Sequence, residues 1–418
     1  MKIFKILLSL LLIAAIAVNI TGCAVTVQAD DLMKDISPNI VSGKSPDDTF
    51  AASMADFSIG LFKKSITEKE NSLVSPLSVM LALAMTANGA NNETLSQMEK
   101  LLSGNIPLKD LNEYLYRYVK ELPSEEKSKL SIANSIWFRD DKDRLGVKAD
   151  FLQKNADYYN AYAYKSAFDE QTMQDINNWV KSNTDGMIEK ILDEIKDTAM
   201  LYLINAVVFD AEWQKPYDKK YDVKESNFTD INGTKQNADF MHSTEYTYLD
   251  DGKATGFIKP YVNNSYSFAA LLPNEGIAIE EYIASLTGTG FKNTIKNAEN
   301  TTVYASMPKF EYEYEIQMND ALKALGMPDA FDGEKADFKK MAASSDGNIY
   351  IGEVLHKTYI SVDERGTKAG AVTKVEMNAM GVPRGQTVQL DRPFVYAIID
   401  NATNLPVFIG TLMTVNKP

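Results

Sequence analysis

A stretch of small residues near the C-terminal end constrains the fold of this chain more than any other feature. It runs from Val362 to Gly381, follows a strand-like segment at 349–362, and has almost no large side chain in its first half. Small or apolar residues alternate along it with mostly polar ones, which is the pattern of a half-buried strand. The residues of the first parity are Thr367, Ala369, Ala371, Thr373, Val375 and Met377. The segment therefore has the composition of an exposed loop and the periodicity of a strand inside a sheet.

These residues resemble the hinge and reactive-centre loop of the serpins. In that family the loop is bait for a protease, and after cleavage it inserts into the central sheet as a new strand. The resemblance rests on Glu364, on Gly366-Thr367 with the small residues after them, and on Arg392-Pro393-Phe394 downstream. It implies six hinge positions, which are Glu364, Gly366, Thr367, Ala369, Ala371 and Thr373.

Two earlier blocks are similar to the same family. Residues 71–85 predict a short strand and then a buried helix, with Ser75 as the N-cap and Pro76 at the first helical position. Residues 200–209 form a near-continuous apolar run, which indicates a central strand covered on both faces. Trp213 follows this run, and the resemblance assigns it to the breach, the end of the sheet where the loop enters.

The resemblance covers essentially everything from Asp47 to the end and implies an α+β serpin fold. We expect one domain with a large, mostly antiparallel central sheet, two smaller sheets, eight or nine helices and an exposed reactive-centre loop. Helices are predicted at 151–164 and 173–192, the second interrupted at Thr184-Asp185-Gly186, and a strand with apolar residues of one parity at 310–316. No repeat or linker interrupts the chain after residue 47. The domain boundaries are a signal peptide at 1–22, a tether or extended arm at 23–46, and the serpin domain at 47–418.

The N-terminus has the features of an export signal. Lys2 and Lys5 precede an apolar stretch at 6–18 that is too short for a comfortable membrane span. Ile20-Thr21-Gly22-Cys23 resembles the bacterial lipobox, which implies that Cys23 is lipidated and holds the exported protein to the membrane at the cell surface. The alternative is ordinary signal cleavage after Ala29 and release to the extracellular space. Cys23 is the only cysteine, so the chain cannot form an intramolecular disulfide.

The remaining sequence favours no catalytic chemistry. A net charge of −14 argues against nucleic acid as a partner, because phosphates are bound by clusters of Lys and Arg. The chain has two histidines, and it lacks HExxH and cysteine zinc motifs, the G-x-S-x-G elbow and the G-x-G-x-x-G loop. We therefore expect neither an enzyme nor a cofactor or metal.

His356 has the parity of Val354, Thr358, Ile360 and Val362, so it points into the core of the predicted sheet. A buried imidazole needs hydrogen-bond partners. In one interpretation, backbone or water supplies them. In the other, which the resemblance implies, Ser75, Ser78 and Asn205 form the serpin shutter with His356 under the central sheet.

The resemblance also implies the function, a suicide inhibitor of serine proteases that traps its target as a covalent acyl complex. The usual spacing from Glu364 places the scissile bond at Met380–Gly381, with Ala379–Met380 as the alternative. A methionine at this position suits the apolar pockets of elastase-, chymotrypsin- or subtilisin-like proteases. We expect a monomer that is able to form loop-sheet polymers.

Other serpin functions remain as alternatives, namely a non-inhibitory binding or structural module and an inhibitor of cysteine proteases. The hinge favours inhibition, because its inward parity contains no bulky or charged residue. Lys368 and Gly370 depart from the pattern of inhibitory relatives, but both have the outward parity.

Overall fold

The computed structural model describes residues 27–67, 69–104, 106–140, 145–197, 199–345, 347–367 and 385–415. Within these ranges the chain forms nine α-helices and two short 3-10 turns, Val262–Asn264 and Asp329–Phe331. The helices are α2 (Asp48–Ser65), α3 (Pro76–Ala87), α4 (Asn92–Ser103), α5 (Leu108–Glu121), α6 (Ala149–Tyr159), α7 (Glu170–Asn183), α8 (Ile279–Ser285), α9 (Gly288–Lys296) and α10 (Asn319–Leu325).

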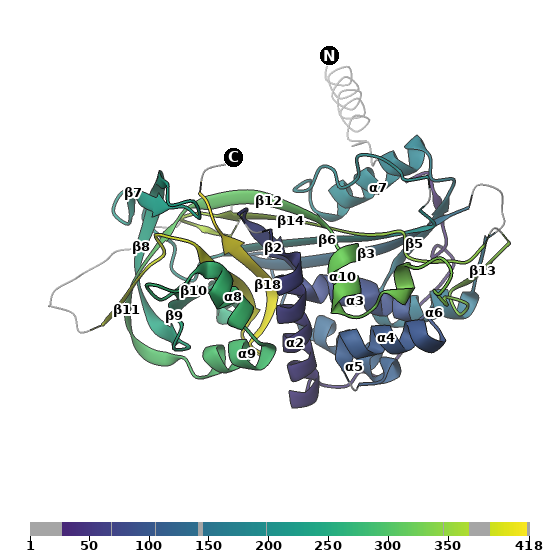
Figure 1. Cartoon of the computed structure of the whole chain (residues 1–418), viewed down its shortest axis with the longest axis horizontal. Helices are drawn as coiled ribbons and strands as arrows, with labels where there is room; N and C mark the ends of the chain where they lie inside the picture. Colours follow the sequence, from purple (N-terminus) through teal and green to yellow (C-terminus); the bar gives the residue numbers. More distant parts are fainter. Residues whose placement is uncertain are drawn as a thin grey trace, which may run out of the picture.

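A central sheet of seven strands crosses the molecule in the order β1-β5-β3-β6-β15-β14-β12 (Figure 1). Neighbouring strands pair antiparallel, except that β3 pairs parallel with β5 and β6 pairs parallel with β14. The strands are β1 (Asp30–Asp31), β3 (Ser128–Arg139), β5 (Tyr162–Ser166), β6 (Leu201–Glu212), β12 (Phe310–Gln317), β14 (Glu353–Val362) and β15 (Gly366–Thr367). The sheet is thus mostly antiparallel, as predicted.

The strands predicted to form two smaller sheets are continuous with one another. They make one sheet of nine strands, in the order β16-β11-β8-β9-β10-β17-β18-β2 with β7 also on β8, and β4 and β13 form a separate pair. The continuity comes from β8, which is 16 residues long and pairs with β7, β11 and β9 along its length. The strands are β2 (Ser72–Val74), β4 (Leu145–Val147), β7 (Val223–Thr229), β8 (Lys235–Asp250), β9 (Ala254–Pro260), β10 (Tyr266–Pro273), β11 (Glu299–Pro308), β13 (Ala342–Ser344), β16 (Gln386–Gln389), β17 (Phe394–Asp400) and β18 (Leu405–Leu412).

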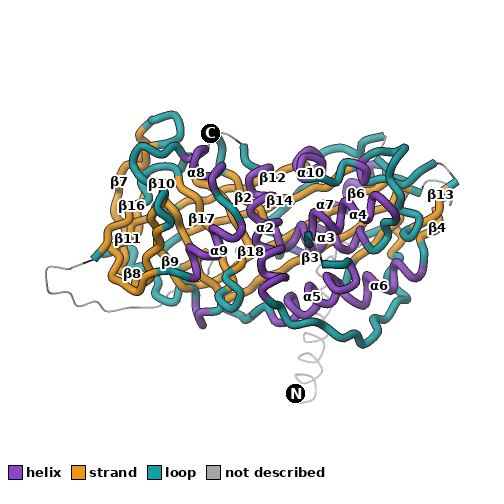
Figure 2. The backbone as a smooth tube through the Cα atoms, turned by 60° about the horizontal axis from the view of Figure 1, so that its bottom comes forward, coloured by secondary structure: helices purple, strands orange, loops and turns teal. Residues whose placement is uncertain are grey.

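Helices cover both faces of the central sheet. Figures 1 and 2 show α7 on one face and the group α2–α6 on the other. Successive residues of β6 therefore enter different cores: Leu201 and Leu203 join the main cluster, whereas Tyr202 and Ile204 join the cluster under α7. This arrangement confirms the central, doubly covered strand that the apolar run predicted.

Two predicted helices end earlier than expected. The first ends at Tyr159, because Asn160 has a left-handed φ of 45° and residues 162–166 pair with β3 as a strand. The second begins at Glu170, after the Asp169 capping box, and ends at Asn183, directly before the interruption predicted at 184–186, but no helix resumes at 187–192. Ile188, Ile191 and Leu192 are buried without being helical. Their apolar spacing imitates a helix, but tertiary contacts determine the backbone.

Residues 27–46 contact the rest of the domain at several points. Strand β1 pairs with β5 and is the edge strand of the sheet, and the Asp175 carboxylate accepts hydrogen bonds from the N–H groups of Gln28 and Ala29 at 2.8 and 2.7 Å. Further along, Asn39 N–H donates to Asp157 at 2.7 Å. None of the helices in the described ranges is long and apolar enough to cross a membrane.

Candidate functional site

Strands β6 and β14 of the central sheet are paired with each other at one end and separated at the other. Strands β6 and β14 pair directly over five residue pairs, from Tyr202↔Glu353 to Ala206↔Lys357. At the other end, Gly366 and Thr367 stand between them and pair with Glu212 and Ala211 of β6. A Cβ atom on Gly366 would lie 2.0 Å from the Ala211 carbonyl oxygen, so the entry point accepts only glycine.

Thr367 is the first inward residue of the predicted hinge, and its side chain is already under the sheet. It is 2% exposed, and its Oγ1 lies 2.6 Å from the Tyr261 hydroxyl. Tyr261 in turn stacks on Trp213, with ring centroids 4.5 Å apart. The hinge therefore rests on an aromatic layer that sequence parity did not reveal.

Trp213 fixes the turn that precedes Thr367. Its backbone N–H donates to the Arg365 carbonyl at 2.8 Å, and its indole N–H donates to the Asp363 carbonyl at 2.9 Å. Trp213 is 1% exposed. The residue that the resemblance assigned to the breach therefore holds both sides of the hinge turn.

Glu364 forms an ion pair with Lys309 at 2.6 Å, between the hinge turn and the start of β12. Burial alone would raise the pKa of the Glu364 carboxyl, but the Lys309 ammonium holds it below its usual value. This partly buried ion pair connects the hinge turn, residues 363–365, to the start of the edge strand β12.

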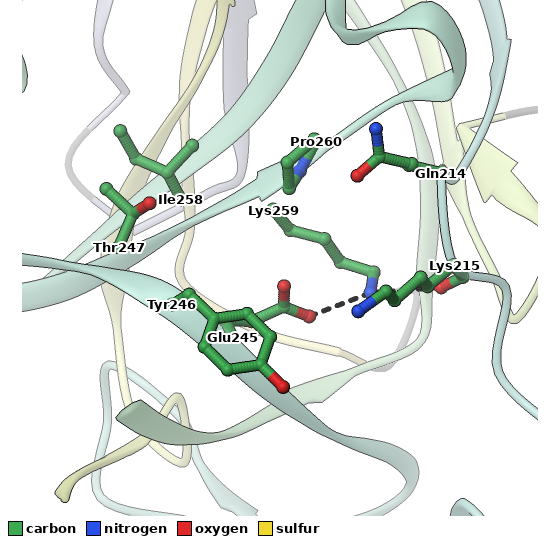
Figure 3. Close-up of a pocket in the computed structure, with 8 residues that line it drawn as sticks. All are labelled: Gln214, Lys215, Glu245, Tyr246, Thr247, Ile258, Lys259 and Pro260. Atoms are coloured by element: carbon green, nitrogen blue, oxygen red, sulfur yellow. Dashed lines mark hydrogen bonds and ion pairs between the residues drawn. The ribbon is translucent and has the colours of Figure 1, made fainter. Parts of the chain in front are cut away.

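Sequence reasoning missed a second ion pair beneath Trp213. Lys259 Nζ donates to Glu245 at 2.8 Å, and both side chains are buried (Figure 3). The same ammonium lies 4.3 Å from the Tyr217 ring centroid and 5.4 Å from that of Trp213. Burial lowers the pKa of Lys259, and Glu245 opposes that shift. We call Trp213, Glu245, Lys259, Tyr261, Lys309, Glu364 and Thr367 the breach cluster.

At the closed end, one hydrogen-bonded cluster contains His356 and the three residues predicted around it. Ser75 N–H donates to His356 Nε2 at 3.1 Å, so Nδ1 carries the proton and donates to Asn205 Oδ1. Asn205 Nδ2 donates to Ser78 Oγ at 2.5 Å, and Ser78 N–H donates to Ser75 Oγ at 3.4 Å. The partners of His356 are therefore one backbone group, from Ser75, and one side chain, that of Asn205.

Asn134 completes this cluster, although the sequence analysis did not select it. Its side-chain oxygen accepts from Asn205 Nδ2. A signal was present, because Asn134 is a polar residue on the same parity as Leu130, Ile132 and Ile136 in β3. We call Ser75, Ser78, Asn134, Asn205 and His356 the shutter cluster.

The shutter cluster is electrically neutral. Burial lowers the pKa of His356 to about 3, so the imidazole is uncharged at neutral pH. Four of the five members are 0–1% exposed and Asn134 is 8% exposed. Their hydrogen bonds join α3, β3, β6 and β14, and they require β6 and β14 to remain adjacent.

The other predicted site residues lie outside the described residues. They are Cys23, Ala369, Ala371, Thr373, Ala379, Met380 and Gly381. Among the described residues, no group of three or more His, Cys, Asp or Glu side chains is placed to hold a metal ion.

Comparison with known proteins gives one family. The family model described as "Serpin (serine protease inhibitor)" matches residues 52–415. A serpin-like protein of Thermococcus kodakarensis is 30% identical, over 85% of this chain and 84% of its own length. Human thyroxine-binding globulin, solved in complex with thyroxine, is 23% identical and shares the fold, with a TM-score of 0.79 over 88% of this chain and 99% of its own.

Among solved structures, the thermophilic serpin tengpin is similar in both sequence and structure. In its native state it is 59% identical, with a TM-score of 0.90 over 93% of this chain and all of its own. In its latent state the TM-score is 0.80, over 90% of this chain and all of its own. The present structure is therefore nearer to the native than to the latent arrangement of that protein.

Proposed function

This chain belongs to the serpin family, whose members are typically suicide inhibitors of proteases, and we propose that it traps serine proteases with apolar specificity pockets. The observation that supports the proposal most directly is the position of Gly366 and Thr367 between β6 and β14. A strand that continues from Thr367 along the same line would separate the five directly paired residues of β6 and β14. Non-inhibitory members of the family exist, so the fold alone does not decide between inhibition and binding.

In the proposed reaction the protease serine attacks the carbonyl carbon of Met380. The Met380–Gly381 amide bond breaks, Gly381 leaves as a free amine, and an ester links Met380 to the protease. The freed arm then enters the sheet with Ala369, Ala371 and Thr373 facing inward by their parity. Each new ladder hydrogen bond contributes about 1 kcal/mol, and burial of the inward faces adds roughly 25 cal/mol per Å². This free energy drags the ester-linked protease along and distorts its active site before the ester is hydrolysed.

The Lys309–Glu364 pair and the aromatic layer support this function by holding the hinge ready. They fix the turn at 363–365 immediately before the inserted residues. Downstream of the bait, β17 and β18 are buried along their whole length, so the C-terminal fragment stays in the fold after cleavage.

The location that we propose is the outer face of the cell membrane. The export signal and the lipobox-like residues that end at Cys23 support this location. Residues 27–46 would then lie between the lipid and the inhibitory domain. Mass spectrometry of the mature protein should find a diacylated Cys23 at the N-terminus. A free N-terminus at Asp30 would instead support ordinary signal cleavage.

The decisive experiment incubates the purified protein with subtilisin and with elastase. We expect a complex that survives denaturing electrophoresis, and a released C-terminal peptide that begins at Gly381, or at Met380 if the alternative bond is cut. Cleavage without any covalent complex would refute inhibition and leave a serpin fold with another function.

A further inference from the structure

Four lysines and two tyrosines are exposed beside the hinge turn, at the end of the molecule that holds β7 and β8 (Figure 1). The tyrosines, Tyr221 and Tyr246, are 66% and 54% exposed. We call the six residues the lysine–tyrosine patch: Lys215, Lys219, Lys220, Tyr221, Lys224 and Tyr246. Tyrosine is enriched at protein interfaces relative to the rest of the protein surface.

The patch is locally positive on a chain of net charge −14. Within the described part of the chain, none of its four lysines forms an ion pair with a carboxylate. Two of them lie over the exposed rings instead, with Lys215 Nζ 5.2 Å from the Tyr246 centroid and Lys220 Nζ 4.9 Å from that of Tyr221. These cations are therefore available to carboxylates from outside.

The acidic residues of this region are already engaged within the protein. Asp218 accepts from the N–H groups of Lys220 and Tyr221, and Asp222 accepts from that of Asp218. Glu245 is paired with the buried Lys259, and Glu225 accepts from Asn237. These hydrogen bonds leave the carboxylates charged, so the four lysines exceed Asp218, Asp222 and Glu225 by one positive charge, while Glu245 and Lys259 cancel.

The patch lies between the two ends of the bait segment. On one side, Tyr217, which lies between Lys215 and Lys219 in the sequence, donates its backbone N–H to the Glu364 carbonyl at 2.8 Å. On the other side, Glu245 pairs with Val303 of β11, and Val303 pairs with Gln386 of β16. Tyr246 directly follows Glu245 in β8. Both points at which the bait segment joins the described structure therefore lie close to the patch, and we expect a protease that holds this segment to approach from this end.

The surface is also preformed. The Lys215 carbonyl accepts from the buried Lys259 ammonium at 3.2 Å, and Gln214 N–H donates to the Pro260 carbonyl at 3.0 Å. Lys215 and Tyr246 line the same small cavity as the Lys259–Glu245 pair (Figure 3). A surface that is already ordered loses little conformational entropy on binding.

We propose that the lysine–tyrosine patch is a second docking surface for the target protease, and that it selects proteases with Asp and Glu beside the active-site cleft. The inference rests on the proposed inhibitory function and names its partner more closely. The lysines would accelerate encounter by electrostatic attraction, and the tyrosines would pack against the protease surface. The carboxylates of Asp218, Asp222 and Glu225, interspersed with the lysines, disfavour an extended polyanion as the occupant.

The test compares two triple variants of the full chain. Lys219→Glu/Lys220→Glu/Lys224→Glu reverses the patch. Lys100→Glu/Lys109→Glu/Lys154→Glu reverses three exposed lysines on α4, α5 and α6, and it changes the net charge equally. The protease is whichever of subtilisin and elastase forms the covalent complex, and the second-order rate constant of inhibition is measured at low and at high salt.

We expect the patch triple to inhibit about tenfold more slowly at low salt and to approach the wild-type rate at high salt, where charges are screened. The control triple should remain within about twofold of wild type. The stoichiometry of inhibition should not change, because the hinge is intact. Amidation of surface carboxylates on the protease, at a level that preserves its peptidase activity, should remove the difference between wild type and the patch triple.

Equal rates for the two triples would overturn the proposal, and so would a difference that survives high salt or amidation. If wild type but not the patch triple is retained on immobilised heparin while the inhibition rates are equal, the patch is a polyanion site instead. Failure of wild type to form a complex with either protease would overturn the inhibitory function itself and this inference with it.

Discussion

The shutter cluster and the breach cluster both hold β6 and β14, but they use different chemistry. In the shutter cluster the strands are in direct register, and neutral hydrogen bonds connect them through Asn205 and His356. In the breach cluster β15 separates the strands, and two ion pairs and a stacked aromatic layer surround the opening. One end of the sheet is therefore closed by short-range bonds, and the other is open and supported by charge.

The difference indicates where opening of the sheet begins and where it is resisted. A hydrogen bond weakens steeply once its atoms move apart, so the shutter cluster must be lost almost completely when the strands separate. Ion pairs and stacked rings tolerate larger shifts, so the breach cluster can persist around an entering strand. We expect insertion to start at Thr367 without much cost and to meet its main resistance at Asn205 and His356.

The largest effect on inhibition should come from a substitution that blocks strand insertion at the open end of the sheet, where β15 lies between β6 and β14. Thr367→Arg places a cation where the side chain is now buried against Tyr261, and insertion would then carry an unpaired charge into the sheet. The bait should still be cut at the same bond, but the protease should be released active. The stoichiometry of inhibition should rise more than about tenfold. Thr367→Ser keeps the hydroxyl and should trap like wild type, whereas trapping by the arginine variant would mean that insertion is not the mechanism.

The next largest effect tests the charges of the breach cluster. Lys259→Met leaves the Glu245 carboxylate buried without its partner, which should lower the free energy of unfolding by about 3–5 kcal/mol. The double variant Lys259→Met/Glu245→Leu removes both charges and should recover most of this loss. Denaturant unfolding measures both. A double variant as unstable as the single would show that packing around Trp213, rather than charge, is the important feature.

A smaller effect is expected at the shutter cluster. Asn205→Ala removes the group that bonds His356, Ser78 and Asn134, and the buried polar atoms left without partners should lower the free energy of unfolding by about 1–3 kcal/mol. The native form should melt at lower temperature and form loop-sheet polymers, which size-exclusion chromatography detects after mild heating. Asn227→Ala, on the exposed face of β7, is the control and should do neither. A monomeric Asn205→Ala protein that melts like wild type would contradict the role given to the cluster.

Acid should weaken the shutter cluster before the breach cluster. At pH 5 the free energy of unfolding should be about 2 kcal/mol lower than at neutral pH because of His356. The pKa of His356 is about 3 in the folded protein and 6.5 in the unfolded chain, so the unfolded chain takes up the proton first. Stability that is fully present above pH 6.5 is therefore lost as the pH falls towards 3. The Glu364 carboxyl has a lowered pKa, so its contribution is lost only below its ordinary value of 4.5. Unfolding of His356→Gln should lack the loss between pH 6.5 and 5, and an unchanged pH profile would rule out His356 as its source.

The sequence predicted those parts of the site that follow from parity along one strand. His356 and Thr367 were placed inward because each shares its alternation with apolar or small neighbours, and the structure buries both. The same rule would have selected Asn134. It failed at 162–166 and 188–192, where short apolar spacings fit a helix as well as a strand, and pairing with β3 or packing under α7 decided the backbone.

The sequence by itself determined which side chains of each strand face the core and where the main strands and helices lie. It also determined that the bait segment has the alternation of a strand. Only the tertiary structure decided that Lys259 and Glu245 are a buried pair and that four lysines gather beside the hinge. Charged residues in a strand have the pattern of a solvated face until another element covers them. Here that element is the turn at 213–217, which closes over β8 and β9 through Trp213 and Tyr217. Contacts between segments so distant in sequence depend on the three-dimensional path of the chain, which alternation along one strand does not encode.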